Sequence, residues 1–463
     1  MKSFLTKHFI FIALIIITLT GVRFCVLMHR QEIGHTLNTV ENIRKNGKLR
    51  LITSKAVNTY YIYNRKPTGF EYDLAREFAQ FMNVELDIIT PGWSNMFAYL
   101  NQGKGDFIAA GLTITAPRLA YADFSIPYMT IQQRIIHHNL IFPPREIKEM
   151  AFDIFHVRRG TSYHNRLAEI KTSGVALEYV LHNNIPTEEL IGMVHDREIK
   201  FTIADSNIAL LNRRFFPDIR IGIPIQERES LAWAVRKNDT AMLKQVNKFF
   251  LYATNTGILQ RITDRYYDNI DNFDAYELKK FHERIETRLP KYKNIIKEES
   301  AKHGFDWRLI AAIVYQESRF DPNAKSFTNV RGLMQVTRKT AKEMGIKNRR
   351  DPQQSVRAGI KYLSLMYKRF DYIEDESERL LFALASYNVG YGHVEDAISL
   401  ARKQGNAPNT WKGLKAALPL LSKAKYYKQT KHGYARGWEP VDYVDRILTY
   451  FDILKQKKTA ITG

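Results

Sequence analysis

The spacing of apolar residues changes once along this 463-residue chain, and the change divides it into two parts of different fold class. Before about residue 268, short apolar segments such as 49–53 and 84–89 alternate with amphipathic helical segments such as 72–82. This alternation predicts an α/β domain with a largely parallel sheet. After Pro290 only helical spacing remains, which predicts a separate, compact all-α domain.

The stretch between these two parts, residues 269–290, is charged and aromatic. It holds no tract rich in Gly, Ser or Pro, so we expect a helical connector rather than a flexible linker. The first domain is then expected to cover residues 38–268 and the second residues 291–454.

The N-terminus carries a targeting signal. Lys2 and Lys7 precede the apolar run 9–22, which has the length of a signal-peptide core. After one arginine the apolar character continues to residue 28, about the length of a membrane span. No cleavage site flanked by small residues is clear. We therefore expect residues 1–30 to be a secretory signal that is either removed or retained as a membrane anchor, with a buried core helix as the alternative.

The net charge of +21 favours acidic partners. The positive charge is concentrated in residues 401–438, which contain nine Lys or Arg and no Asp or Glu. This stretch is expected to be a solvated basic loop or a surface that faces acidic groups. Cys25 is the only cysteine, which excludes an intrachain disulfide and a zinc finger. No nucleic-acid-binding module or phosphate-binding loop is present, so no nucleic acid, metal or cofactor is expected.

Glu317 lies where a helix should present an apolar face. The helix is expected to begin after the N-cap Asp306 and to end near Asp321-Pro322. Glu317 follows the apolar stripe formed by Ile310, Ile313 and Val314. Burial and the negative end of the helix dipole both favour its protonated form. Glu317 is therefore a candidate general acid, and the alternative is a glutamate at a frayed helix end.

Three sequence blocks follow one another along this part of the chain, and the first contains Glu317. The first includes Glu317-Ser318 and Gly332-Leu333-Met334-Gln335, the second is Ala385–Val394, and the third is Glu439–Val444. Together they resemble the signature of the lysozyme-like lytic transglycosylases over about residues 290–453. The chain departs from that signature at Val330-Arg331 and at Pro440, and neither departure involves the acid.

The resemblance implies an enzyme that cleaves murein glycan strands without water. Glu317 would protonate the glycosidic oxygen that leaves N-acetylmuramic acid, and then take the proton of the sugar's 6-hydroxyl as a 1,6-anhydro ring closes. Glycoside hydrolysis normally needs two carboxylates. Here only Glu317 is a convincing buried acid, since Asp321 is expected to be a structural cap. A hydrolytic muramidase and a non-catalytic cell-wall-binding protein are the alternatives.

Six further residues of these blocks are expected from the resemblance to bind or position the glycan: Ser326, Met334, Gln335, Tyr387, Asn388 and Tyr443. Ser326 and Gln335 would hydrogen-bond the sugar, and Tyr387 would orient the acid. The other three would line the groove. Each of these residues could instead serve only in packing. This alternative is strongest for Met334, and for Tyr443 the packing and functional interpretations are equally strong.

The first domain contains a second set of motifs. Gly69–Ala75 and Gly105–Tyr128 resemble segments of the extracellular solute-binding proteins of family 3, and a weaker likeness continues to about residue 267. The resemblance implies two lobes that close over a ligand. One lobe would be formed by residues 46–135 with 230–268, and the other by residues 140–225.

An amino acid or peptide end presents a carboxylate, which a guanidinium binds well, and an ammonium, which a carboxylate binds. The resemblance places Arg118 and Asp205 in these two roles. Neutral hydrogen bonds would come from Thr113, Thr115 and Thr161. The alternative for Arg118 is a surface arginine, and the alternative for Asp205 is a cap at the end of a strand. The ligand is expected to be an amino acid or a muropeptide.

The order of the two domains resembles the membrane-bound lytic murein transglycosylases. That resemblance implies an exported, periplasmic protein at the outer membrane, with peptidoglycan strands, a small ligand and the membrane as partners. Anchoring in the inner membrane through residues 9–28 is the alternative.

Overall fold

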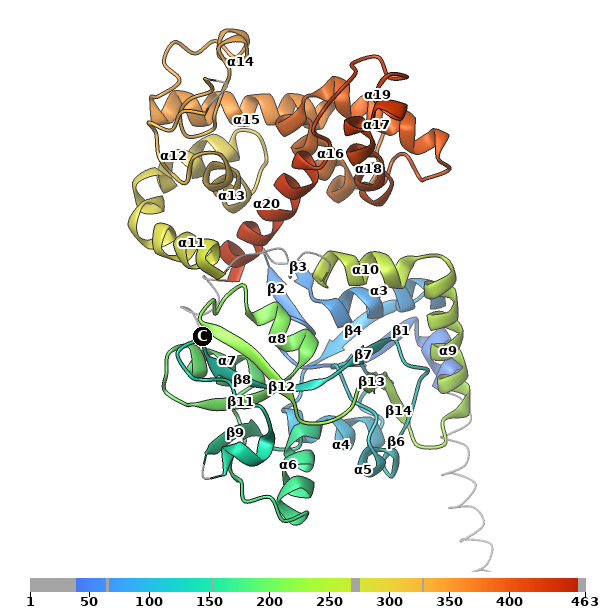
Figure 1. Cartoon of the computed structure of the whole chain (residues 1–463). Helices are drawn as coiled ribbons and strands as arrows, with labels where there is room; N and C mark the ends of the chain where they lie inside the picture. Colours follow the sequence, from blue (N-terminus) through green and yellow to red (C-terminus); the bar gives the residue numbers. More distant parts are fainter. Residues whose placement is uncertain (1–38, 64–65, 152, 268–274, 327–328, 457–463) are drawn as a thin grey trace, which may run out of the picture. The chain divides into compact units, whose positions relative to one another are not determined.

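The computed structural model describes residues 39–63, 66–151, 153–267, 275–326 and 329–456. It divides the chain into two compact units, Met1–Asp271 and Asn272–Gly463 (Figure 1). The expected signal or anchor, residues 1–30, lies outside the described residues. No helix within the described ranges has the length and apolar character needed to cross a membrane.

The first unit has two lobes, each built on a five-stranded mixed sheet (Figure 1). In the first lobe the strand order is β4 (Glu85–Ile89), β1 (Lys48–Ile52), β5 (Phe107–Ile108), β14 (Ala234–Arg236), β6 (Ala122–Phe124). Strands β4, β1 and β5 are parallel, and β14 runs antiparallel to both of its neighbours. The helices α3 (Phe70–Met82), α9 (Thr240–Asn255) and α10 (Ile258–Tyr267) contribute to its main apolar core.

The sheet of the second lobe has the order β10 (Glu178–His182), β9 (Ile154–Arg158), β11 (Phe201–Asp205), β8 (Gln133–His138), β12 (Ile219–Pro224). Its one reversed strand is β8, which begins at Gln133 and is buried along nearly its whole length. The first crossing between the lobes therefore falls before residue 133, earlier than the sequence analysis placed it. At the crossing, β7 (Met129–Ile131) pairs antiparallel with β13 (Glu229–Leu231), so the two connections lie side by side.

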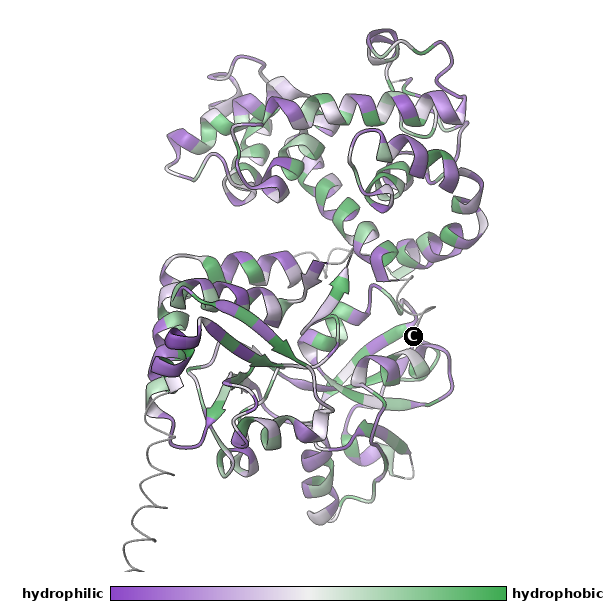
Figure 2. Ribbon diagram, turned by 180° about the vertical axis from the view of Figure 1, so that it is seen from behind, coloured by the Kyte–Doolittle hydropathy of each residue, from purple (hydrophilic) through white to green (hydrophobic). Residues whose placement is uncertain are grey.

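The second unit is built from helices. Their bounds are α11 Ala275–Thr287, α12 Leu289–Ala301, α13 Trp307–Ser318, α14 Arg338–Glu343, α15 Pro352–Arg369, α16 Glu376–Val389, α17 Tyr391–Lys403, α18 Trp411–Ala417, α19 Ala424–Tyr427 and α20 Glu439–Gln456. The central helix α13 packs against α12 and α20, and α16 packs against α15 and α20. Figure 2 shows apolar residues on α13 and α20 and on the strands of both sheets. The predicted α/β and all-α classes are confirmed.

The expected connector contains α11, which belongs to the second unit. The ring of Phe281 lies 4.4 Å from that of Tyr315 and 4.5 Å from that of Tyr450, between centroids. Arg319 also pairs with Glu277 at 2.7 Å. These contacts tie α11 to the helical core.

The basic stretch 401–438 is not a simple loop. It contains α18, a 3₁₀ helix at Leu418–Ser422 and α19. Leu414, Leu418 and Leu421 are buried, so this stretch has its own apolar anchor. The sequence analysis missed these helices because each is shorter than two full turns and shows little periodicity.

Candidate functional site

Helix α13 places Glu317 in its last turn. The helix begins after Asp306, whose carboxylate accepts the Arg308 amide at 2.9 Å. It ends at Ser318 because Arg319 and Phe320 adopt left-handed backbone angles, with φ of 56° and 58°. The end is therefore a left-handed cap, earlier than the Asp321-Pro322 boundary expected from the sequence. The side chain of Glu317 still projects at the carboxyl end of a buried helix.

Protein surrounds the carboxyl group of Glu317, although the residue as a whole is partly exposed. Burial raises the pKa of Glu317 to about 7, and a hydrogen bond from Tyr443 acts in the opposite direction. The Tyr443 hydroxyl donates to Oε1 at 2.5 Å. Near pH 7 the group can therefore both give and accept a proton.

Tyr443 and Tyr387 differ in what they contact. The Tyr443 hydroxyl, from α20, binds Glu317, whereas the Tyr387 hydroxyl donates to the Met334 carbonyl at 2.8 Å. The structure thus places Tyr443, rather than Tyr387, in position to orient the acid. Packing of α20 against α13 brings these residues together across 126 positions of sequence.

The turn after Ala324 is held by its own polar side chains. The Gln335 amide donates to the carbonyls of Ala324 at 3.0 Å and Gly332 at 2.8 Å. The Ser326 hydroxyl accepts the Val330 amide at 3.3 Å. Ser326 and Gln335 therefore stabilise this loop. Any hydrogen bond from them to a sugar would use side-chain donors or acceptors that these contacts leave available.

Two other predicted groove residues lie in different environments. Met334 is 0% exposed, and its side chain packs where a Cβ on Gly359 would lie, 2.5 Å from it. The structure places Met334 in the core rather than on a groove wall, because α15 approaches it closely at that glycine. Asn388 is exposed at the end of α16, next to Tyr387.

The arrangement contains no second carboxylate paired with the first. The pKa of Glu317 has two causes, burial and the Tyr443 hydrogen bond, and neither is a neighbouring acid. Asp321 accepts the Asn323 amide at 2.9 Å and so caps the turn, as expected of a helix stop before proline. The described residues thus bring one carboxyl group to this site.

A tyrosine substitution tests the local electrostatics. Because the Tyr443 hydrogen bond favours the ionised carboxyl, Tyr443→Phe should raise the pKa of Glu317 further. The decline of kcat/KM at alkaline pH should then move about one pH unit upward. Tyr387→Phe is the matched control, since its hydroxyl binds a carbonyl instead, and the position of its alkaline decline should not change. An unchanged profile in Tyr443→Phe would contradict the assignment.

The first unit contains a second site, between its lobes. Three contacts close the lobes on one another: Trp93 Nε1 donates to the Gly160 carbonyl at 3.3 Å, Arg118 donates to the same carbonyl at 3.3 Å, and the Thr113 and Ser162 hydroxyls lie 3.3 Å apart. The cavity between the lobes is small, about 40 Å³.

Arg118 and Asp205 both line this cavity. Arg118 is buried and also donates to the Thr113 carbonyl at 2.9 Å. Asp205 is buried at the start of α8 (Ser206–Asn212) but makes no side-chain capping bond there. Burial and the charge of Glu229 raise the pKa of Asp205 to about 7, and Arg118 opposes that rise.

Three residues that line the cavity have a buried polar atom with no hydrogen-bond partner among the described residues: Asn58 Oδ1, Arg158 Nε and Asp205 Oδ1. Thr115 Oγ1 is also buried without a partner, but Thr115 does not line the cavity. Unsatisfied buried atoms are costly and rare, so their grouping here indicates a polar ligand site. Thr161, in contrast, caps α6 (Ser162–Thr172) and donates to the Arg158 carbonyl at 2.7 Å.

The cavity is also lined by residues that were not predicted from the sequence, among them Trp93, Arg158 and Glu188. The Arg158 guanidinium lies over the Trp93 ring, 5.0 Å from its centroid. No local pattern marks these residues, because they meet only when the two lobes close.

Family models match both parts of the chain. The family model for the Transglycosylase SLT domain matches residues 294–409, which include Glu317, Tyr387 and Asn388. The model for bacterial extracellular solute-binding proteins, family 3, matches residues 49–269, which include Arg118 and Asp205.

Two relatives match this chain over most of their own length. The membrane-bound lytic murein transglycosylase F of Desulfosudis oleivorans is 51% identical over 91% of this chain and 93% of its own length. The protein of the same name from Pseudomonas putida strain W619 is 39% identical over 90% of this chain and 87% of its own. The chain therefore belongs to the membrane-bound lytic murein transglycosylase F family of enzymes.

Proposed function

We propose that this chain cleaves the β-1,4 bond between N-acetylmuramic acid and N-acetylglucosamine in peptidoglycan, and that it forms 1,6-anhydromuramoyl ends. The observation that carries the proposal is the carboxyl of Glu317, buried at a helix end, bound by Tyr443 and with a pKa of about 7. A group with that pKa is suited to act as an acid and then as a base at neutral pH.

The reaction needs one proton to leave Glu317 and one to return. Glu317 protonates the glycosidic oxygen as the bond to the anomeric carbon breaks. The resulting carboxylate then removes the proton of the muramic acid 6-hydroxyl, whose oxygen forms the new bond to the anomeric carbon. The acid is regenerated and no water is consumed.

A hydrolytic muramidase is the alternative within the same site. It would need a second carboxylate to act as nucleophile or to activate water. The absence of an acidic neighbour among the causes of the Glu317 pKa supports the ring closure instead. A protein that only binds the cell wall is a third possibility, but binding alone would not require the raised pKa of Glu317.

Mass spectrometry of digested sacculi separates these possibilities. Purified full-length protein should release muropeptides with anhydro ends that carry no oxygen from ¹⁸O-labelled water. Reducing ends labelled with ¹⁸O would support hydrolysis. Binding to sacculi without soluble product would support a non-catalytic protein.

We infer that the first unit binds an amino acid or a muropeptide between its lobes. Arg118 would bind a carboxylate and Asp205 an ammonium, with Thr113 and Thr115 as neutral partners. The unsatisfied atoms around the cavity support a polar ligand. A cavity of about 40 Å³ is too small for an amino acid, so the lobes must part to admit one. Such opening gives the domain a way to regulate the enzyme.

Ligand binding should depend on Arg118. In calorimetric titrations of the full-length chain with amino acids and disaccharide tripeptides, Arg118→Gln should weaken binding by about tenfold to several hundredfold, because a charge-assisted contact is lost. Arg159→Gln is the control, because Arg159 is exposed and bonded to Asn183. Affinity should rise between pH 6 and 8, since Asp205 ionises only near pH 7.

The same substitution tests regulation. A ligand that binds the unaltered chain should change its rate of sacculus digestion, and Arg118→Gln should remove that response. Identical rates with and without bound ligand would contradict a regulatory role.

We also propose that the protein is exported and acts at the periplasmic side of the outer membrane. The expected signal in residues 1–30 supports export, and the names of the relatives support association with a membrane. Membrane fractionation distinguishes it from anchoring in the inner membrane through residues 9–28.

A further inference from the structure

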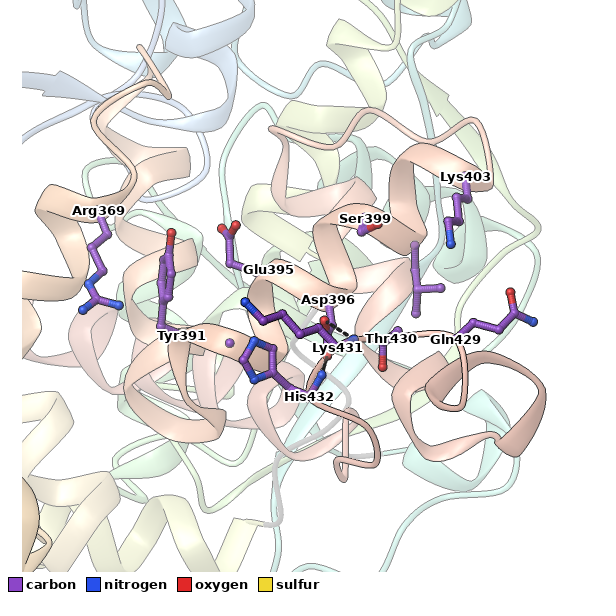
Figure 3. A pocket seen from close by; sticks show the side chains of 12 residues that line it. Arg369, Tyr391, Glu395, Asp396, Ser399, Lys403, Gln429, Thr430, Lys431 and His432 are labelled. Atoms are coloured by element: carbon purple, nitrogen blue, oxygen red, sulfur yellow. Dashed lines mark hydrogen bonds between the residues drawn. The ribbon is translucent and has the colours of Figure 1, made fainter.

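The second unit contains a hollow of about 650 Å³ that none of the predicted site residues line. It lies between α17, the end of α15 and the segment 429–432 (Figure 3). In Figure 3 the extended side chain of Lys431 runs across the hollow, with Tyr391 on one side and Thr430 on the other. Part of its lining, Lys403 and residues 429–432, belongs to the basic stretch 401–438, for which the catalytic chemistry gives no role.

The carboxylates of the hollow are already engaged. Asp396 accepts the backbone amides of Lys431 at 3.1 Å and His432 at 2.8 Å, so it holds the loop in place. Glu395 accepts a hydrogen bond from the Tyr391 hydroxyl. The negative charges in the wall thus have structural partners.

The cations are less constrained. The Arg369 guanidinium lies over the Tyr391 ring, 4.4 Å from its centroid. Within the part of the chain that the structure describes, Lys403 and Lys431 have no carboxylate within 4.0 Å, and both are exposed. Two lysines that face one hollow, with the acids held elsewhere, favour an anionic ligand. Ser399, Gln429 and Thr430 add neutral hydrogen-bonding groups of the kind that peptide amides use.

The shape of the hollow depends on a glycine. A Cβ at Gly392 would lie 2.7 Å from the imidazole of His432, so the glycine leaves room for that ring against α17. Together with the Asp396 bonds, this contact fixes the segment that carries Lys431.

The hollow also lies close to the proposed reaction. Tyr391 follows Tyr387 by four residues. An extended chain of that length spans at most about 14 Å. The charge of Glu317 raises the pKa of Tyr387, so that tyrosine is a neighbour of the acid. A group attached to the sugar being cleaved could reach the hollow.

We propose that this hollow binds a carboxylate of the stem peptide carried by the muramic acid residue at the cleavage site. This inference rests on the proposed function. The lactyl group of muramic acid carries a peptide with free carboxylates, whereas the sugar rings are uncharged, so in the intact strand the peptide supplies the negative charge that two lysines favour. Lys403 and Lys431 would form charge-assisted hydrogen bonds to the peptide.

The test compares rates on two substrates with the full-length chain. One is peptidoglycan with its stem peptides, and the other is glycan from which an amidase has removed them, so that only the lactyl carboxylate beside each muramic acid ring remains. The double variant Lys403→Gln/Lys431→Gln should lose about fivefold to twentyfold in kcat/KM on the first substrate and less than about twofold on the second. Lys403→Glu alone should show the same selective loss. Lys412→Gln is the control, because Lys412 is exposed in the same basic stretch but does not line the hollow.

A competition experiment adds a second readout. Free stem tripeptide should slow digestion of intact peptidoglycan by the unaltered chain, and the tripeptide with amidated carboxylates should not. Equal losses on both substrates, or no loss on either, would overturn the proposal. The proposal would also be overturned if the double variant kept its digestion rates but bound more weakly to vesicles of phosphatidylglycerol and phosphatidylcholine. That result would assign the hollow to a lipid headgroup. If the proposed function itself were wrong, the unaltered chain would release products with reducing ends or no product at all.

Discussion

Glu317→Gln should abolish digestion of sacculi, with a loss of at least about a thousandfold in kcat/KM, because the amide can neither give nor take the proton that both steps need. The fold should remain intact, since the amide oxygen can still accept the hydrogen bond from Tyr443. The measurement is release of soluble muropeptides by purified full-length protein. Glu298→Gln is the matched control, because Glu298 is exposed on α12 and pairs only with Lys302 among the described residues.

The same substitution should stabilise the protein at alkaline pH. The pKa of Glu317 is raised from 4.5 to about 7 on folding, so its favourable contribution to folding is fully present below pH 4.5 and is lost once the pH passes 7. Glutamine is neutral throughout. At pH 8 the variant should therefore unfold at a higher temperature, with a gain of up to about 3 kcal/mol in unfolding free energy. A lower melting temperature at pH 8 would contradict the burial of this carboxyl.

Gly332→Ala should destabilise the second unit by about 3–5 kcal/mol, as a side chain forced against backbone does. Gly332 has a φ of 87°, and a Cβ there would lie 1.8 Å from the Arg349 carbonyl oxygen. The turn must shift to make room. Because the Gly332 carbonyl binds Gln335 and the adjacent Met334 carbonyl binds Tyr387, activity should fall as well.

Gly345→Ala is the control for this effect. Gly345 has a similar φ of 77°, but a Cβ there would meet nothing within 4 Å. Its expected cost is only the backbone penalty, about 1 kcal/mol. Thermal unfolding followed by circular dichroism separates the two variants. Equal losses would show that the close approach at Gly332 has no energetic weight.

The helix that carries the acid could be predicted from local sequence. The apolar stripe, the Asp306 cap and the position of Glu317 all follow from spacing within one helix. The partner of the acid could not be predicted with the same certainty. Tyr387 and Tyr443 both belong to the motif blocks, so the motifs do not distinguish them. The packing of α20 against α13 decides which hydroxyl contacts the carboxyl of Glu317. Met334 shows the same limit, since its burial depends on Gly359 in another helix.

The first unit shows the contrast on a larger scale. The predicted segments 49–53, 72–82 and 84–89 agree with β1, α3 and β4 within two residues, because each lies within one local period. The sequence did not indicate that β8 belongs to the second sheet, since the pairing of strands depends on distant partners. The residues that cross the cleft, such as Trp93 and Arg158, become neighbours only through lobe closure.

Glu317 must stay protonated up to about neutral pH to act as the acid, and titration of this carboxyl measures whether it does. The protein would be labelled with ¹³C at glutamate side-chain carboxyls, and the Glu317 signal assigned as the one missing from Glu317→Gln. We predict a midpoint near pH 7. A midpoint near 4.5, the ordinary value for glutamate, would contradict the account, because such a group is already ionised when it must act as an acid.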